Sequence, residues 1–147
     1  ISYEGRKKKR LKYIRWQRKH PNSLWQMDVS DQKVKGKYCF AVIDDCSRYC
    51  LGVFEINRAT TAVITKLLDK LVEKHGKPRG IKHIRTAIHS PTTTGKIERF
   101  FQTLEKELPF YNNDLDFFRL RYNHFRPHIS LEKKCPADVY FDFIHLF

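Results

Sequence analysis

The first structured segment of the chain is marked by apolar residues at every second position. Trp25, Met27 and Val29 alternate with polar residues, which predicts a strand with one buried face. Residues 38–43 are an unbroken apolar run, typical of a central strand that is buried on both faces. After a polar turn, residues 49–56 predict a third strand. These segments follow one another closely, so we expect an antiparallel meander.

From Thr60 onward the apolar residues recur at the spacing of a helix instead. Thr60 is a suitable N-cap and Gly76 a suitable stop for the first helix, and two more helices are expected over 97–108 and 114–125. Between the first two helices, residues 81–88 alternate like a strand. Because a helix separates this strand from the preceding one, it should lie parallel to a member of the sheet. The pattern therefore predicts an α/β fold with a mixed sheet and flanking helices.

The composition is that of one globular domain. The chain has 147 residues, of which 41% are hydrophobic and 14% aromatic, enough to bury a core. No apolar run approaches the roughly 20 residues of a membrane span, and nothing resembles a signal peptide. Four cysteines at irregular spacing do not make a disulfide scaffold, which favours a reducing, cytoplasmic setting. The chain begins with Ile1, so we expect it to be a piece of a longer protein.

The positive charge is concentrated in two zones. The net charge is +13, from 29 basic and 16 acidic residues. Residues 1–27 hold nine basic residues and one acid, and residues 74–97 hold six basic residues and no acid. Such zones indicate nucleic acid, because neutralising its phosphates releases counterions, although a solvated basic linker is the alternative. We expect residues 1–22 to be a basic arm and residues 23–147 the folded core. In the arm, the expected nucleic-acid contacts are Lys7, Lys8, Lys9, Arg10 and Arg15.

Two carboxylates occupy positions that suit a metal site. Asp28 lies mid-strand on the polar face, and Glu98 lies in the first turn of a helix. Enzymes that act on phosphodiesters commonly hold two Mg²⁺ ions, with carboxylate ligands on rigid elements. Each residue also has a simpler interpretation. Asp28 is then a strand residue bonded to neighbouring backbone, and Glu98 a solvated residue at a helix start.

Four short motifs occur in order along the chain. They are Trp25-Gln26-Met27-Asp28-Val29, Ala41-Val42-Ile43-Asp44-Asp45-Cys46-Ser47-Arg48, Gly95-Lys96-Ile97-Glu98-Arg99-Phe100 and Tyr122-Asn123-His124-Phe125-Arg126-Pro127-His128. Together they resemble the catalytic core of insertion-sequence transposases and retroviral-type integrases, over about residues 22–140. The resemblance implies an RNase H-like fold and a triad of two Asp and one Glu, which binds Mg²⁺ or Mn²⁺ and transfers DNA 3′ ends. By position, Asp28 matches the first Asp and Glu98 the Glu, and Lys96 and Arg99 are candidate phosphate contacts.

The chain departs from this family at the second catalytic Asp. In the family that Asp ends a fourth strand, in an Asp-X-Gly loop followed by a helix. These elements would fall between Pro78 and Ile81, where only two residues stand, and no acid occurs in residues 74–97. The sequence therefore indicates an internal deletion that removes the usual fourth strand and the following helix. The strand at 81–88 should then either move next to the strand of Asp28 or leave an unpaired edge beside a buried segment. We expect the centre to be catalytically defective.

Other residues that bind metals or phosphates in proteins have competing interpretations. The four cysteines lack the spacing of a zinc site and are expected to be buried thiols. His89 is a weak candidate for a nitrogen ligand, because Mg²⁺ prefers oxygen. Asp44 and Asp45 match a turn motif outside the family's catalytic set. His124 and His128 either contact DNA phosphate or cap a helix end at the surface.

Three functions remain open. The first is a transposase or integrase core that acts on transposon ends and target DNA with Mg²⁺, as a homo-oligomer in the cytoplasm at the nucleoid and without membrane contact. The second is a defective remnant that binds DNA nonspecifically and performs no chemistry. The third is an RNase H-like nuclease, against which the transposase motifs count. The missing Asp-X-Gly loop favours the second function and leaves the family resemblance unchanged.

Overall fold

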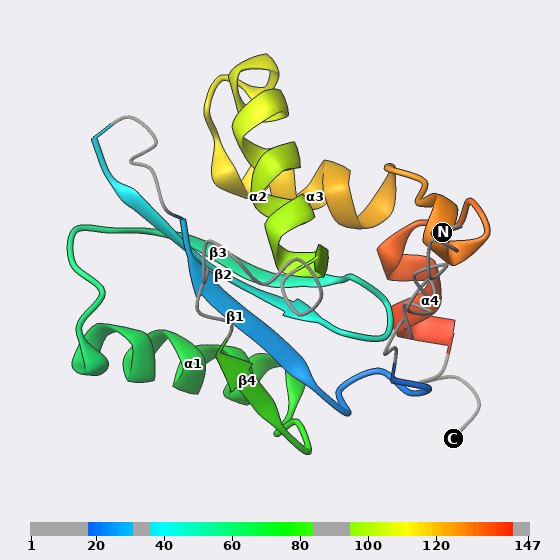
Figure 1. The fold of residues 1–147 in the computed structure, drawn as a ribbon, viewed down its shortest axis with the longest axis horizontal. Helices are drawn as coiled ribbons and strands as arrows, with labels where there is room; N and C mark the ends of the chain where they lie inside the picture. The colour runs from blue at the N-terminus through cyan, green and yellow to red at the C-terminus, as the bar shows by residue number, and fades with distance from the viewer. Residues whose placement is uncertain (1–17, 31–35, 84–94, 143–147) are drawn as a thin grey trace, which may run out of the picture.

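Among the residues that the structure describes, a mixed sheet of four strands lies at the centre of the fold (Figure 1). The computed structural model of the protein describes residues 18–30, 36–83 and 95–142. The strands are β1 (Trp25–Val29), β2 (Tyr38–Asp44), β3 (Cys50–Ile56) and β4 (Ile81–His83). β1, β2 and β3 form an antiparallel meander, β4 runs parallel to β1, and the order in the sheet is β3-β2-β1-β4. The predicted α/β fold with a mixed sheet is confirmed.

Helices cover both faces of this sheet. They are α1 (Thr61–His75), α2 (Gly95–Glu107), α3 (Leu115–His124) and α4 (Pro136–Asp142), with the short 3₁₀ turns η1 (Leu108–Tyr111) and η2 (Ile129–Leu131). In Figure 1, α1 lies below the sheet and α2 and α3 lie above it. None of the described helices is long and apolar enough to cross a membrane.

The unbroken apolar run of β2 follows from its position between these two layers. Alternate side chains of a strand point to opposite faces. Ala41 and Ile43 pack in the cluster with α2 and α3, whereas Phe40 and Val42 pack in the cluster with α1 and α4. Both faces of β2 are therefore in the core, as the sequence pattern predicted.

The predicted helix ends are confirmed at α1 and α3. The Thr60 hydroxyl accepts a hydrogen bond from the first turn of α1 at 3.3 Å, and Gly76 ends that helix with φ +86°. The side chain of Asp114 caps α3 by accepting hydrogen bonds from the backbone N–H groups of Asp116 and Phe117. The helix expected over 97–108 ends at Glu107 instead, because Pro109 lacks an N–H and the chain continues as η1.

β4 lies beside β1, which is the first of the two arrangements expected for the shortened segment. It pairs in parallel with residues 25–27 of β1, and the backbone N–H of Trp25 donates to the carbonyl of Gly80 at 3.0 Å. The path from β3 through α1 to β4 is the parallel crossover that the sequence predicted. The strand predicted over 81–88 is thus confirmed beside the strand of Asp28 for its first three residues, and residues 84–88 lie outside the described part of the chain.

Candidate metal and nucleic-acid site

The two carboxylates predicted to hold a metal lie on the α2 side of the sheet. Trp25, Met27 and Val29 of β1 pack in the cluster with α1, so Asp28 projects toward the opposite face. Asp28 is 4% exposed, and its Oδ1 accepts a hydrogen bond from the backbone N–H of the next residue at 2.8 Å. Glu98 is exposed in the first turn of α2, a helix that packs over β1 and β2. One carboxylate is therefore buried on the strand and the other is exposed on the helix above it.

No third ligand joins these two carboxylates in the part of the chain that the structure describes. Among those residues, no group of three or more His, Cys, Asp or Glu side chains is placed to hold a metal ion. A two-metal centre needs carboxylates that hold both ions, and Mg²⁺ takes several oxygen ligands. Asp28 and Glu98 alone do not fit a pair of Mg²⁺ ions. The alternative ligand, His89, lies outside the described residues.

The cysteines do not offer a zinc site. All four are free thiols, and Cys39, Cys46 and Cys50 are buried. Burial raises the pKa of Cys39 and Cys46 to about 11 and that of Cys50 to about 12. Among the residues that the structure describes, these thiols belong to no group of three or more side chains placed to hold a metal ion. For these three residues the prediction of buried thiols is confirmed.

Asp45 is the centre of an ionic network that joins four segments of the chain. Its Oδ1 accepts hydrogen bonds from Lys96 Nζ and Gln26 Nε2, both at 2.7 Å. Its Oδ2 accepts from the backbone N–H of Arg18 at 2.8 Å. The main-chain carbonyl of Asp45 accepts from Arg48 Nη1, also at 2.7 Å. The network therefore ties the end of the predicted arm, β1, the turn after β2 and the first turn of α2 together.

Sequence reasoning missed this network, because it assigned Asp44 and Asp45 only to a turn. Asp44 is fully buried and accepts hydrogen bonds from the backbone N–H and hydroxyl of Ser47, at 2.9 and 2.7 Å, and from the backbone N–H of Asn22 at 2.8 Å. Burial raises the pKa of Asp44, and the bonds from Ser47 and Asn22 oppose the rise. The available signal was the pair of acids at the end of a buried strand, since buried carboxylates need partners.

Two of the predicted nucleic-acid contacts lie among the described residues. The side chain of Lys96 is 16% exposed and is held by Asp45. Burial lowers the pKa of Lys96, and the hydrogen bond to Asp45 opposes this effect. Arg99 is exposed on the same helix. The predicted contacts in residues 7–15 lie outside the described part of the chain.

The fourth motif serves mainly to hold the fold together. Asn123 is fully buried, and its side chain bonds to the backbone N–H and the carbonyl of Cys50 at 2.7 and 2.9 Å. His128 lies edge-on to the buried ring of Tyr122, with centroids 5.1 Å apart. Burial, and then the charge of Arg126, lowers the pKa of His128 to about 4. Its imidazole is therefore neutral at physiological pH and adds no positive charge for a phosphate.

A meander extended by one parallel strand, with helices on both faces and an acid on the first strand, defines an RNase H-like α/β domain. The sequence model of the family described as integrase core domain matches residues 18–105. A second model with the same description matches residues 79–136. Because the first match covers more than half of the chain, the chain belongs to the integrase core domain family.

Solved structures of retroviral integrases are similar to this fold. A chain of the simian T-cell lymphotropic virus intasome, solved in complex with PP2A regulatory subunit B56 gamma, matches with a TM-score of 0.70 and 18% identity. The match covers 85% of this chain and 56% of that chain. The HTLV-2 integrase catalytic core, solved with magnesium in a dimeric form, matches with a TM-score of 0.66 and 17% identity, over 82% of this chain and 97% of that one. The predicted resemblance to integrase cores is confirmed.

Proposed function

We propose that the protein is an integrase-type core that binds DNA and does not transfer DNA strands. Membership of the integrase core domain family supports a role in DNA integration or transposition. The observation that carries the proposed loss of chemistry is the donor set. Asp28 and Glu98 have no third metal ligand beside them among the described residues, and no acid occurs in residues 74–97.

The surface proposed to contact DNA includes the connection between α1 and β4. Lys74, Lys77, Arg79 and Lys82 follow one another along this connection and are all exposed. Cations that neutralise phosphates release condensed counterions, which supplies affinity without sequence selectivity. Because β4 lies beside β1, this surface lies at the edge of the sheet next to the strand of Asp28.

We also propose that Asp28 and Glu98 are the remaining carboxylates of the family's Mg²⁺ centre. Two carboxylates supply fewer oxygen ligands than a pair of Mg²⁺ or Mn²⁺ ions requires, so the affinity of the site for such ions is low. The proposed DNA partners are transposon ends and target DNA, bound by a homo-oligomer in the cytoplasm at the nucleoid. The dimeric and trimeric forms of the HTLV-2 core support an assembly of this kind.

The test is nicking of a supercoiled plasmid at low salt in Mg²⁺ or Mn²⁺, with Asp28→Asn and Glu98→Gln as controls. We expect wild-type protein to nick no faster than the double variant, because the ligand set is incomplete. Nicking that either substitution abolishes would show that the centre is active and would overturn the proposed loss of chemistry.

The binding half of the proposal needs a separate measurement. Fluorescence anisotropy with a labelled duplex at several salt concentrations should give an affinity that falls steeply as salt rises. Absence of duplex binding at low salt would contradict the proposal, whatever the plasmid assay shows.

A further inference from the structure

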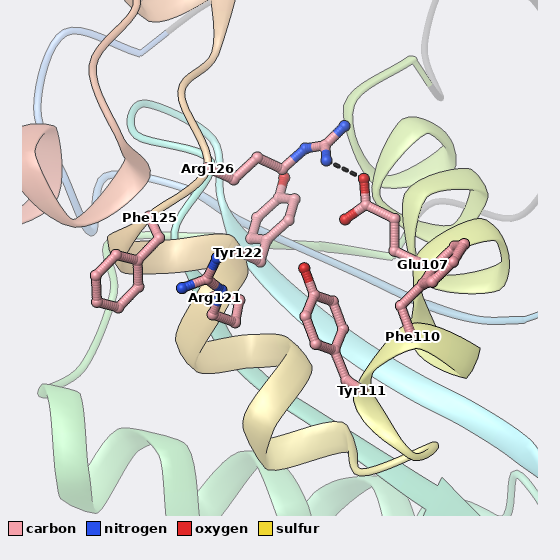
Figure 2. A pocket seen from close by; sticks show the side chains of 7 residues that line it. All are labelled: Glu107, Phe110, Tyr111, Arg121, Tyr122, Phe125 and Arg126. Atoms are coloured by element: carbon pink, nitrogen blue, oxygen red, sulfur yellow. Dashed lines mark hydrogen bonds and ion pairs between the residues drawn. The ribbon is translucent and has the colours of Figure 1, made fainter.

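An open groove lies at the end of α2 that is remote from the candidate site. It has a volume of about 350 Å³ and is formed by the last residue of α2, η1 and the C-terminal part of α3. Four of its seven lining residues are aromatic and two are arginines. Figure 2 shows Tyr111 and Arg121 between the rings of Phe110 and Phe125. Neither the metal centre nor the basic connection between α1 and β4 includes this groove.

Two of the four aromatic rings of the groove are largely exposed to solvent. Phe110 is 83% exposed and Phe125 is 59% exposed, whereas Tyr122, which forms the floor, is 4% exposed. Single exposed apolar residues are ordinary, but two open rings in one concave site offer flat surfaces to a ligand. The ring of Tyr111 lies between them, with its hydroxyl directed into the groove (Figure 2).

The charges of the groove favour an anionic ligand. The guanidinium of Arg121 lies over the ring of Phe125, 4.8 Å from its centroid, which holds the cation at the surface. The second arginine, Arg126, forms an ion pair with Glu107 (Figure 2). The lining residues therefore carry one net positive charge, and the guanidinium of Arg121 is oriented by the ring of Phe125.

We propose that this groove binds an unpaired strand of DNA, with a base stacked on Phe110 and a phosphate of the strand paired with Arg121. Aromatic faces combined with cations are how proteins hold single strands without sequence preference. The inference rests on the proposed DNA binding, and it adds a second contact of a different kind from the duplex surface. Glu107 lies nine residues after Glu98 in α2, about 14 Å along the helix axis, so the groove and the candidate site lie at opposite ends of this helix.

A peptide with an acidic and an aromatic residue is the competing occupant, and the test separates the two. Affinities for a single-stranded oligonucleotide and for the matching duplex are measured with wild-type protein, Phe110→Ala, Arg121→Gln and Leu120→Ala. Leu120 is the matched control, because it is 47% exposed on α3 and does not line the groove. A 5-iodouracil in the oligonucleotide reports stacking by photocrosslinking, mapped by mass spectrometry.

We expect Phe110→Ala to lower single-strand affinity about tenfold and to leave duplex affinity within about twofold. Arg121→Gln should reduce the slope of log affinity against log salt for the single strand by about 0.7, the value of one phosphate contact. The crosslink should map to Phe110, and Leu120→Ala should behave as wild type.

The inference would be overturned if Phe110→Ala bound the single strand as tightly as wild type, or if the crosslink mapped only to residues outside the groove. A peptide would then be the remaining candidate ligand. Wild-type protein that binds duplex but not single strands would overturn the inference and keep the proposed function. Protein that binds neither would overturn both.

Discussion

Single side chains complete hydrogen bonds that the sheet of this protein leaves open. β2 and β3 lose their regular register between Val42 and Ile43, close to the first residue of β3, Cys50. The side-chain amide of Asn123 reaches that residue from α3 and bonds to both of its backbone groups. A buried backbone donor and acceptor without partners cost far more than the bonds themselves contribute. Asn123 therefore supplies, from α3, the hydrogen-bond partners of the backbone N–H and carbonyl at the start of β3.

Asn123→Ala should lower the free energy of unfolding by about 2–4 kcal/mol, because it leaves both groups of Cys50 buried and unpaired. Asn123→Asp should also destabilise, since it replaces the donor by a buried charge that faces a carbonyl. Urea unfolding measures both effects. Gln102→Ala, an exposed amide on α2, is the control and should stay within about 0.5 kcal/mol of wild type. Equal stability of Asn123→Ala and the control would contradict the assignment.

His128 makes the stability of the protein depend on pH. Its pKa is about 4 in the folded protein, below the ordinary value of 6.5, because it is buried beside positive charges. Between these two values the unfolded chain binds a proton that the folded chain does not. The contribution is therefore present above about pH 6.5 and is lost as the pH falls toward 4.

Urea unfolding at pH 7 and pH 4.5 should show this loss as a difference between wild type and His128→Phe. We expect wild type to lose about 1–3 kcal/mol more than the variant on acidification. His75, whose pKa burial also lowers, titrates in both proteins and cancels in the comparison. Identical pH dependence of the two proteins would show that His128 is not the titrating group.

At the scale of elements, the position of α2 over the sheet depends on more than its apolar face. Ile97, Phe100 and Leu104 bury that face in the core. The ion pair of Lys96 with Asp45 fixes the first turn, where Glu98 stands, to the turn that follows β2. Both side chains are largely buried, so removing either one would leave the other as an unpaired buried charge.

A double-mutant cycle with Asp45→Asn and Lys96→Met should give a coupling energy of about 1–3 kcal/mol. Asp45→Asn alone should cost more than the coupling, because it also weakens the bonds from Gln26 and Arg18. The exposed pair Lys37–Glu55, with side chains 52% and 43% exposed, is the control and should couple by less than about 0.5 kcal/mol. Equal coupling in the two pairs would mean that Asp45 does not position α2.

The sequence predicted those elements whose signals are local. The alternation of β1, the apolar run of β2 and the N-cap Thr60 each depend on a few neighbouring residues. Helix α4 was not predicted, because its buried residue Tyr140 is held by a ring stack with Tyr49, 4.4 Å between centroids, far away in the sequence. The candidate site shows the same difference between local and distant signals. The positions of its two carboxylates followed from motifs, whereas the network of Asp45 depends on a lysine 51 residues away.

At the scale of the whole molecule, positive charge is distributed unevenly along the chain, and one cluster of it is exposed in the folded protein. The exposed cations of the connection from α1 to β4 lie in a stretch without acids, residues 74–97. Other cations are paired with carboxylates, among them Lys96 at the end of the same stretch, with Asp45, and Arg126, with Glu107. A partner that is drawn to local potential and not to net charge should therefore bind at this connection.

Replacing Lys74, Lys77, Arg79 and Lys82 together by Gln tests whether DNA follows this local surface. A control protein carries the same loss, from +13 to +9, at exposed positions elsewhere: Lys66, Lys106, Lys133 and Lys134. Each lost phosphate contact should reduce the slope of log affinity against log salt for duplex DNA by about 0.9. We expect a reduction of about 2–4 in the first protein and less than about 1 in the control. Because both proteins have the same net charge, equal slopes would mean that DNA responds to total charge alone, and the connection between α1 and β4 would then not be the binding surface.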